Sequence, residues 1–184
     1  MSDTTEPSRA PWGELPPETA AVLATVAQEL RPDVDQIADQ MIAAQRAEIP
    51  GYYEMFDSSL VADARSVSVA VVGLWLDVMV SGTGLSDDDI APVTEGSRRR
   101  AVQGVGLEPL LRAYRVGIRV MWTQLIASSA WKRSSLDGAM GQLATGALAF
   151  ADRLTTAVAA AYLYQVPHPT RAPQPRRPAL PTRI

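Results

Sequence analysis

The chain has 184 residues, 17 of them basic and 20 acidic, with a net charge of −3 and 47% hydrophobic residues. This composition is typical of one globular domain and excludes a chain that is disordered throughout. The absence of cysteine excludes disulfides, thiolate metal sites and a cysteine nucleophile. The first residues are acidic and polar, unlike a signal peptide, and the longest apolar run, residues 67–80, is interrupted and too short to span a membrane. We therefore expect a cytoplasmic protein without membrane contact.

Apolar residues recur at steps of three and four through most of the chain, which predicts helices and no strands. Residues 1–15 are expected to be disordered because prolines and a glycine interrupt any pattern. The first helix is predicted over residues 17–30 and the second over residues 32–49, each starting at a proline, which suits the first turn. The aromatic turn that follows, residues 50–56, is expected to pack over one end of a helical bundle.

Two long helices are predicted, one from a cap at Asp57 or Ser58 to residue 80 and one over residues 135–165. Their apolar side chains alternate steps of four and three, which is typical of helices packed along their length. Glycines keep the second of these helices thin, so that a neighbour can approach closely. The sequence leaves open whether the two apolar seams face each other or a second copy of the chain, and we expect a homodimer.

The segment between these helices is predicted to contain shorter helices and turns. Ser86 and the acidic residues 87–89 are expected to cap a short helical turn, where the helix dipole favours negative charge. A separate helix is predicted over residues 92–103, and Gly104 and Gly106 allow the backbone to stop it and start the next. Residues 131–135 are expected to form a polar connection.

The helix that starts after Gly106 has an apolar stripe on one side and arginines on the other. Guanidinium groups suit carboxylate and phosphate recognition, so arginines of this region are candidates for a ligand or partner surface. The candidates are Arg98, Arg99, Arg100, Arg112, Arg115 and Arg119. The alternative is a solvated face neutralised by salt bridges, because charge runs on helices are usually solvated.

For these arginines we expect two different environments. Arg115 and Arg119 are predicted to be partly buried and salt-bridged, whereas Arg99 and Arg112 are predicted to be exposed and available. If the glycine turn folds residues 98–100 back toward the following helix, the two sets converge on one electropositive patch.

Several kinds of chemistry are disfavoured by the sequence. The single histidine, His168, lies in a proline-rich tail, which argues against haem, a histidine metal site or a histidine-based catalytic site. The acids of residues 87–89 lack the spacing of a calcium loop, and a helix start explains them better. We therefore expect no metal, no cofactor and no enzymatic activity.

The last segment, residues 166–184, contains six prolines, four arginines and no acidic residue, and is predicted to be a disordered tail. Its charge of +4 leaves −7 on residues 1–165, and a DNA-reading module would be expected to be basic. Direct DNA binding is not expected.

The central run, residues 98–122, resembles the N-terminal regulatory domain of PucR-type actinobacterial transcriptional regulators, also described as RsbRD N-terminal-like. Among the matching motif and core residues are Gln103, Gly104, Leu107, Tyr114, Gly117 and Trp122. Weaker matches are the turn at residues 47–52 and the start of an alanine-rich helix at residues 150–153. The resemblance covers residues 16–165.

This resemblance implies a single all-α domain of about six helices, and a globin-like arrangement without haem is known among related co-antagonist domains. It further implies a sensory or dimerising input domain that acts through a regulatory partner in transcription or stress signalling. In the family, a DNA-binding domain usually follows; here only the Pro/Arg tail follows residue 165, so we expect no DNA-binding domain in the chain. The alternative function is a small-ligand sensor that binds an anionic metabolite at the arginines.

Overall fold

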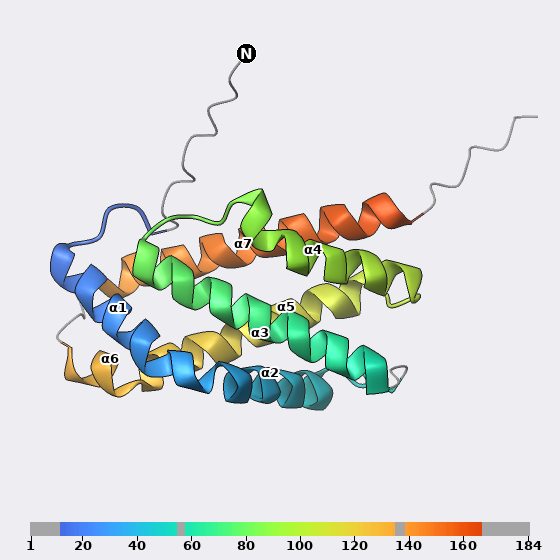
Figure 1. The fold of residues 1–184 in the computed structure, drawn as a ribbon, viewed down its shortest axis with the longest axis horizontal. Coiled ribbons are helices and arrows are strands. Elements are labelled where there is room, and N and C mark those ends of the chain that lie inside the picture. Colours follow the sequence, from blue (N-terminus) through green and yellow to red (C-terminus); the bar gives the residue numbers. More distant parts are fainter. Residues whose placement is uncertain (1–11, 55–57, 135–138, 167–184) are drawn as a thin grey trace, which may run out of the picture.

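The computed structural model describes residues 12–54, 58–134 and 139–166 of the chain. Six long helices and one short helix account for most of them, and the described residues contain no strand, so the all-α prediction is confirmed (Figure 1). The elements are α1 (Pro17–Leu30), a 3-10 turn (Arg31–Asp33), α2 (Val34–Glu48), α3 (Ser58–Ser81), α4 (Asp87–Val102), α5 (Leu107–Ala127), α6 (Ser129–Arg133) and α7 (Met140–Gln165).

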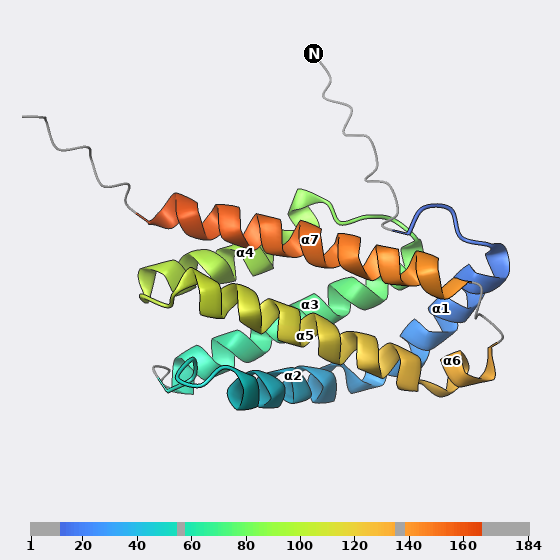
Figure 2. The same ribbon diagram turned by 180° about the vertical axis from the view of Figure 1, so that it is seen from behind.

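Five of the helices form a closed ring around the core. Each contacts the next in the order α2, α3, α4, α7, α5 and back to α2. In Figure 1, α3 crosses the front between α2 and α4; from behind, α5 lies between α2 and α7 (Figure 2). The remaining helices, α1 and α6, contact each other and close one end of the ring. Because every ring helix has two neighbours, each buries a broad apolar face.

An aromatic cluster fills the core at the end near α1. Trp75 of α3 makes edge-to-face contacts with Trp12 and Phe150, with ring centroids 6.1 and 4.9 Å apart. A side chain at Gly146 of α7 would place its Cβ 2.6 Å from the Trp12 ring, so glycine is what lets the indole enter. The prediction that residues 1–15 are disordered is therefore wrong for its last part: Trp12 is core, while residues 1–11 lie outside the described region.

Other helix boundaries differ from the predictions in the middle of the chain. Residues 87–102 form one helix, α4, with Pro92 inside it, where we predicted a capped turn followed by a separate helix. Ser86 and Asp89 form a capping box that secures the first turn, so the hydrogen bond lost at the proline does not end the helix. The first part of the predicted polar connection, residues 131–133, belongs to the short helix α6, which Ser128 caps.

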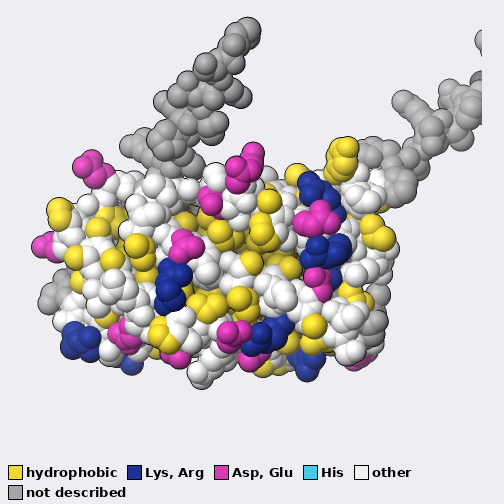
Figure 3. Space-filling view, in the orientation of Figure 1, with side chains coloured by type: hydrophobic (Ala, Val, Ile, Leu, Met, Phe, Trp, Pro, Cys, Tyr) yellow, Lys and Arg dark blue, Asp and Glu magenta, His cyan; other side chains and the backbone are white. Residues whose placement is uncertain are grey.

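Of the helices described, α3 is the one that is long and apolar enough to cross a membrane by length and composition. Within its most apolar 18-residue window, 39% of the residues are buried. Its neighbours α1, α2 and α4 cover this buried side, and a core helix of a bundle has the same composition. Figure 3 shows hydrophobic side chains on the outer face of the bundle between clusters of paired acidic and basic groups.

Replacing Trp12 with alanine tests whether the segment before α1 belongs to the folded domain. We expect Trp12→Ala to lower the free energy of unfolding by about 3 kcal/mol, as for other buried aromatic side chains. Urea denaturation followed by circular dichroism measures this change. The neighbouring exposed Glu14→Ala is the control, with a change within about 0.5 kcal/mol. Equal midpoints for the two variants would show that Trp12 does not contribute to the core.

Candidate functional site

The junction between α4 and α5 fixes the position of the central sequence motif. Gly104 has a φ of +77°, and the N–H groups of Gly104 and Val105 donate to the carbonyls of Ala101 and Arg100, which is a Schellman ending for α4. Val105 is buried, and its carbonyl oxygen accepts a hydrogen bond of 2.7 Å from the Tyr162 hydroxyl of α7. The junction is thus held against the last helix.

The three consecutive arginines of α4 diverge, because successive residues of a helix point about 100° apart. Arg98 pairs with Glu95 on the exposed side of the helix. Arg99 reaches across to Asp63 of α3, with 2.7 Å between Nη2 and Oδ1. Arg100 points inward and is 3% exposed.

Arg100 is the buried cation of this region. Its Nη1 lies 2.7 Å from Asp63 Oδ2, at an angle that makes an ion pair and not a well-aligned hydrogen bond. Nη1 also donates to Gln103 Oε1 (3.0 Å), and Nη2 donates to the carbonyl of Leu60 (3.3 Å). The Asp63 carboxylate therefore bridges Arg99 and Arg100, one oxygen to each, and joins α3 to α4.

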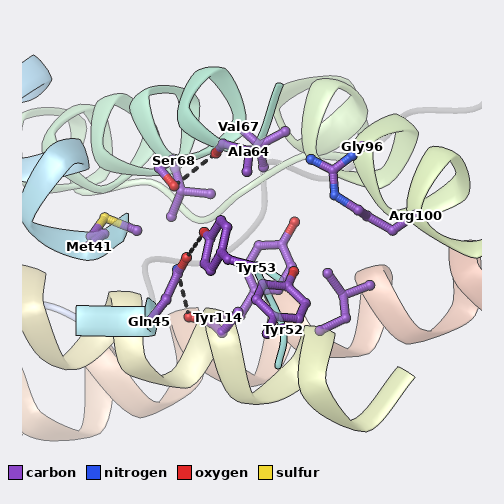
Figure 4. Close-up of a pocket in the computed structure, with 13 residues that line it drawn as sticks. Met41, Gln45, Tyr52, Tyr53, Ala64, Val67, Ser68, Gly96, Arg100 and Tyr114 are labelled. Atoms are coloured by element: carbon purple, nitrogen blue, oxygen red, sulfur yellow. Dashed lines mark hydrogen bonds between the residues drawn. The ribbon is translucent and has the colours of Figure 1, made fainter. Parts of the chain in front are cut away.

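A cavity of about 40 Å³ lies beside Arg100 (Figure 4). Helices α2, α3, α4 and α5 and the aromatic turn before α3 line it. Its polar lining comes from Gln45, Tyr52, Tyr53, Ser68, Arg100 and Tyr114. Gln45 is anchored on both sides, because its amide donates to the Ala113 carbonyl at 3.0 Å and its Oε1 accepts from Tyr53.

The tyrosines of the cavity stay protonated at neutral pH. Burial raises the pKa of Tyr52 to about 12, against the opposing effect of the Arg100 guanidinium. Burial also raises the pKa values of Tyr53 and Tyr114. For Asp63, burial alone would raise the pKa, but hydrogen bonds and charge from Arg99 and Arg100 outweigh it and hold the pKa below its usual value.

The arginines of α5 have a different environment from those of α4. The buried face of α5 contains Leu110, Tyr114 and Met121, so positions 112, 115 and 119 face outward. Arg119 pairs with Glu48 of α2 and remains 58% exposed. Within the described part of the chain, Arg112 and Arg115 are exposed and have no ion pair.

Two predictions about these arginines are therefore wrong. Arg115 is neither buried nor paired, and Arg99 is held by Asp63 and Glu95 instead of being available. The exposure of Arg112 and the salt bridge of Arg119 are confirmed, whereas partial burial of Arg119 is not. The two sets also do not converge, because the α4 set turns toward α3 while Arg119 turns toward α2.

The motif residues outside the arginines have structural roles. Gln103 and Gly104 are exposed. Gln103 accepts a hydrogen bond from Arg100, and Gly104 forms the turn after α4. A Cβ at Gly117 would lie 2.5 Å from Met41 Cε, so the flexible end of the Met41 side chain would have to move to admit one. Of the other motif residues, Tyr114 is buried, and Leu107 and Trp122 are half-buried. Sequence reasoning missed Asp63, Gln45 and the tyrosines of the turn, which no motif links to Arg100.

The comparison with known families decides the family relationship. The model of the RsbT co-antagonist protein RsbRD N-terminal domain matches residues 35–176, most of the chain. This chain belongs to the RsbRD N-terminal domain family. The membership places it among regulatory and stress-signalling domains. No curated protein and no solved structure shows significant similarity to it.

In this RsbRD N-terminal domain, the acids at the start of α4 are explained by local structure. Asp89 accepts the Ser86 N–H at 2.8 Å as part of the capping box, and Asp87 pairs with Arg153. No cluster of three or more metal-ligating side chains occurs among the described residues.

Removing the Asp63 charge tests whether the buried ion pair supports the domain. Asp63→Asn leaves Arg100 without its counter-charge, and we expect a loss of about 3 kcal/mol in the free energy of unfolding at pH 7. Because the pKa of Asp63 is lowered in the folded state, the wild type has this stability above the ordinary carboxyl pKa and loses it as the pH falls through the lower folded value.

Chemical denaturation across pH measures both effects, and the two proteins should converge in acid. Asp77→Asn is the matched control, because its ion pair with Arg31 is exposed and contributes less than about 1 kcal/mol. A similar small loss for both variants would contradict the structural role of Asp63.

Proposed function

We propose that the chain is a non-enzymatic regulatory input domain that acts in the cytoplasm by binding another regulatory protein. Membership of the RsbRD N-terminal domain family supports the regulatory part. The sequence motif of α4 and α5 supports a relation to PucR-type regulators, and we propose that output to transcription passes through the partner and not through direct DNA contact.

The observation that carries this proposal is the outward face of α5. Arg112 and Arg115 project from a helix whose other side is fixed in the ring, and neither has an ion pair within the described residues. We call these two residues the α5 arginine face. A rigid helix with two unpaired guanidinium groups suits an acidic surface on a partner, because arginine binds carboxylates through two parallel hydrogen bonds.

An anionic metabolite at these arginines is the second candidate. Small ligands are usually enclosed over most of their surface by a concave site. The α5 arginine face consists of exposed side chains one turn apart on a single helix, which favours the extended surface of a protein. We therefore prefer the protein partner, and the family name makes an RsbT-type protein the first one to test.

Alanine substitution of the α5 arginine face tests this function. We expect Arg112→Ala/Arg115→Ala to weaken binding of an RsbT-type protein from the same genome roughly tenfold, because charge complementarity across the interface is lost. Titration calorimetry measures the affinity at two salt concentrations, and the wild-type affinity should fall as salt rises. The melting temperature should not change, since the two side chains have no partners to lose.

The control is Lys132→Ala/Arg133→Ala, which removes the same charge from two exposed positions on α6. Equal weakening by both double variants would indicate a general charge effect and would count against a specific face. A large loss of stability in the first variant would instead assign a structural role to its arginines.

We also propose that the domain forms a homodimer, through the side of α7 and α4 that lies outside the ring. The glycine argument from the sequence does not support this, because Gly146 contacts Trp12 of the same chain. What supports it is exposed apolar surface: Leu148 and Leu163 of α7 are 72% and 51% exposed, and Val102 of α4 is 71% exposed. Apolar side chains along one long helix are typical of interfaces between copies.

Charged residues on this surface should separate the copies. We expect the wild type to sediment at about twice the 19.8 kDa mass of the chain and Leu148→Glu/Leu163→Glu to sediment as a monomer with an unchanged helical spectrum. Sedimentation velocity measures both. Gln36→Glu, at an exposed position of α2, is the control and should remain dimeric. A wild type that is monomeric at micromolar concentration would refute the dimer.

A further inference from the structure

The cavity beside Arg100 lies inside the ring, on the opposite side of α5 from the arginine face. Its volume of about 40 Å³ can hold about three water molecules or one molecule of three or four heavy atoms. Four of the five ring helices line it. Anything bound there would contact elements that are far apart in the sequence.

Tyr114 shows that this cavity has an unused hydrogen-bonding group. The residue is 8% exposed and lines the cavity (Figure 4), yet its hydroxyl has no hydrogen-bond partner among the described residues. The groups that act electrostatically on its hydroxyl are Tyr52, Arg100, Asp63 and Arg99. A hydroxyl that has no protein partner and lines a cavity offers a position where water or a ligand can complete a hydrogen bond.

The rest of the lining is divided into a polar and an apolar side. Ser68 donates its hydroxyl hydrogen to the Ala64 carbonyl at 3.0 Å, so its oxygen remains an acceptor. Met41, Val71 and Leu110 provide apolar surface. A fitting ligand therefore combines a hydrogen-bonding oxygen with a small apolar part.

The charges around the cavity decide the charge of the ligand. Arg100 is the one charged side chain among the described residues that line the cavity, and Asp63, which it shares with Arg99, is its counter-charge. The tyrosine hydroxyls are neutral because burial raises their pKa values. A buried anion would compete with Asp63 for the Arg100 guanidinium and would bring a like charge close to that carboxylate, in addition to its own desolvation cost. A neutral ligand has no such cost.

We propose that this cavity binds a small uncharged molecule of three or four heavy atoms, whose carbonyl oxygen accepts a hydrogen bond from Tyr114. A short amide has this chemistry, with its carbonyl toward Tyr114, its N–H toward Ser68 and its remaining part against Met41 and Val71. This ligand site goes beyond the proposed protein interaction and does not depend on it.

The test uses two pairs of probes that have the same shape and differ in charge: formamide with formate, and acetamide with acetate. The full chain is titrated while its amide resonances are followed by NMR. We expect formamide or acetamide to shift resonances of α2 and α5 near the cavity with saturation at a Kd of about 1 mM or weaker, since so few atoms limit the affinity. The matching anion should bind at least about tenfold more weakly.

Tyr114→Phe should weaken amide binding about tenfold without lowering the melting temperature, because the removed hydroxyl has no protein partner. Tyr164→Phe, at a tyrosine that is 85% exposed, is the matched control and should bind like the wild type.

Absence of saturable shifts near the cavity would mean that only water occupies it and would overturn the proposal. Equal binding of amide and anion, or unchanged binding in Tyr114→Phe, would overturn it as well. The Arg112→Ala/Arg115→Ala variant should keep amide binding, so failure of one proposal is distinguishable from failure of the other.

Discussion

The ion pair between Arg100 and Asp63 is the constraint on which the rest of the site depends. A guanidinium that is 3% exposed requires a counter-charge and hydrogen-bond acceptors in fixed positions. Asp63 of α3, the Leu60 carbonyl and Gln103 provide them. These partners fix α3 against α4 and set the start of the glycine turn, and the same guanidinium forms one wall of the polar cavity.

This constraint divides the arginines of the central motif into two groups. The α4 arginines are used within the domain, where they form ion pairs with Asp63 and Glu95. On α5 the helix buries Tyr114 and Gly117 against its neighbours, which turns Arg112 and Arg115 to the outside. The buried ion pair and the outward face of α5 thus lie on two helices joined by one turn, and a change on that face need not disturb the ion pair.

The fold could largely be predicted from the sequence because its signals are local. Apolar residues at helical spacing, Pro17 at a helix start, Ser86 with Asp89 as a cap and Gly104 at a helix end each act within about four residues. They placed α1, α2 and α5 close to their observed positions. The helical period also predicted that Arg112 lies opposite the apolar stripe of α5.

The partners of each charge were decided by the tertiary structure alone. Arg99 meets a carboxylate 36 positions away, and Arg119 meets one 71 positions away, at distances along the chain where no local pattern indicates contact. The same holds for Trp12, whose indole enters the core because α7 has a glycine opposite it. It also holds for the cavity, whose polar groups come from α2, α3, α4, α5 and the aromatic turn before α3. The sequence by itself therefore determined the helices and their apolar faces, because hydrogen bonds and side-chain spacing within a helix are local. Which arginines are buried, and which stay exposed without an ion pair among the described residues, depends on how the ring closes.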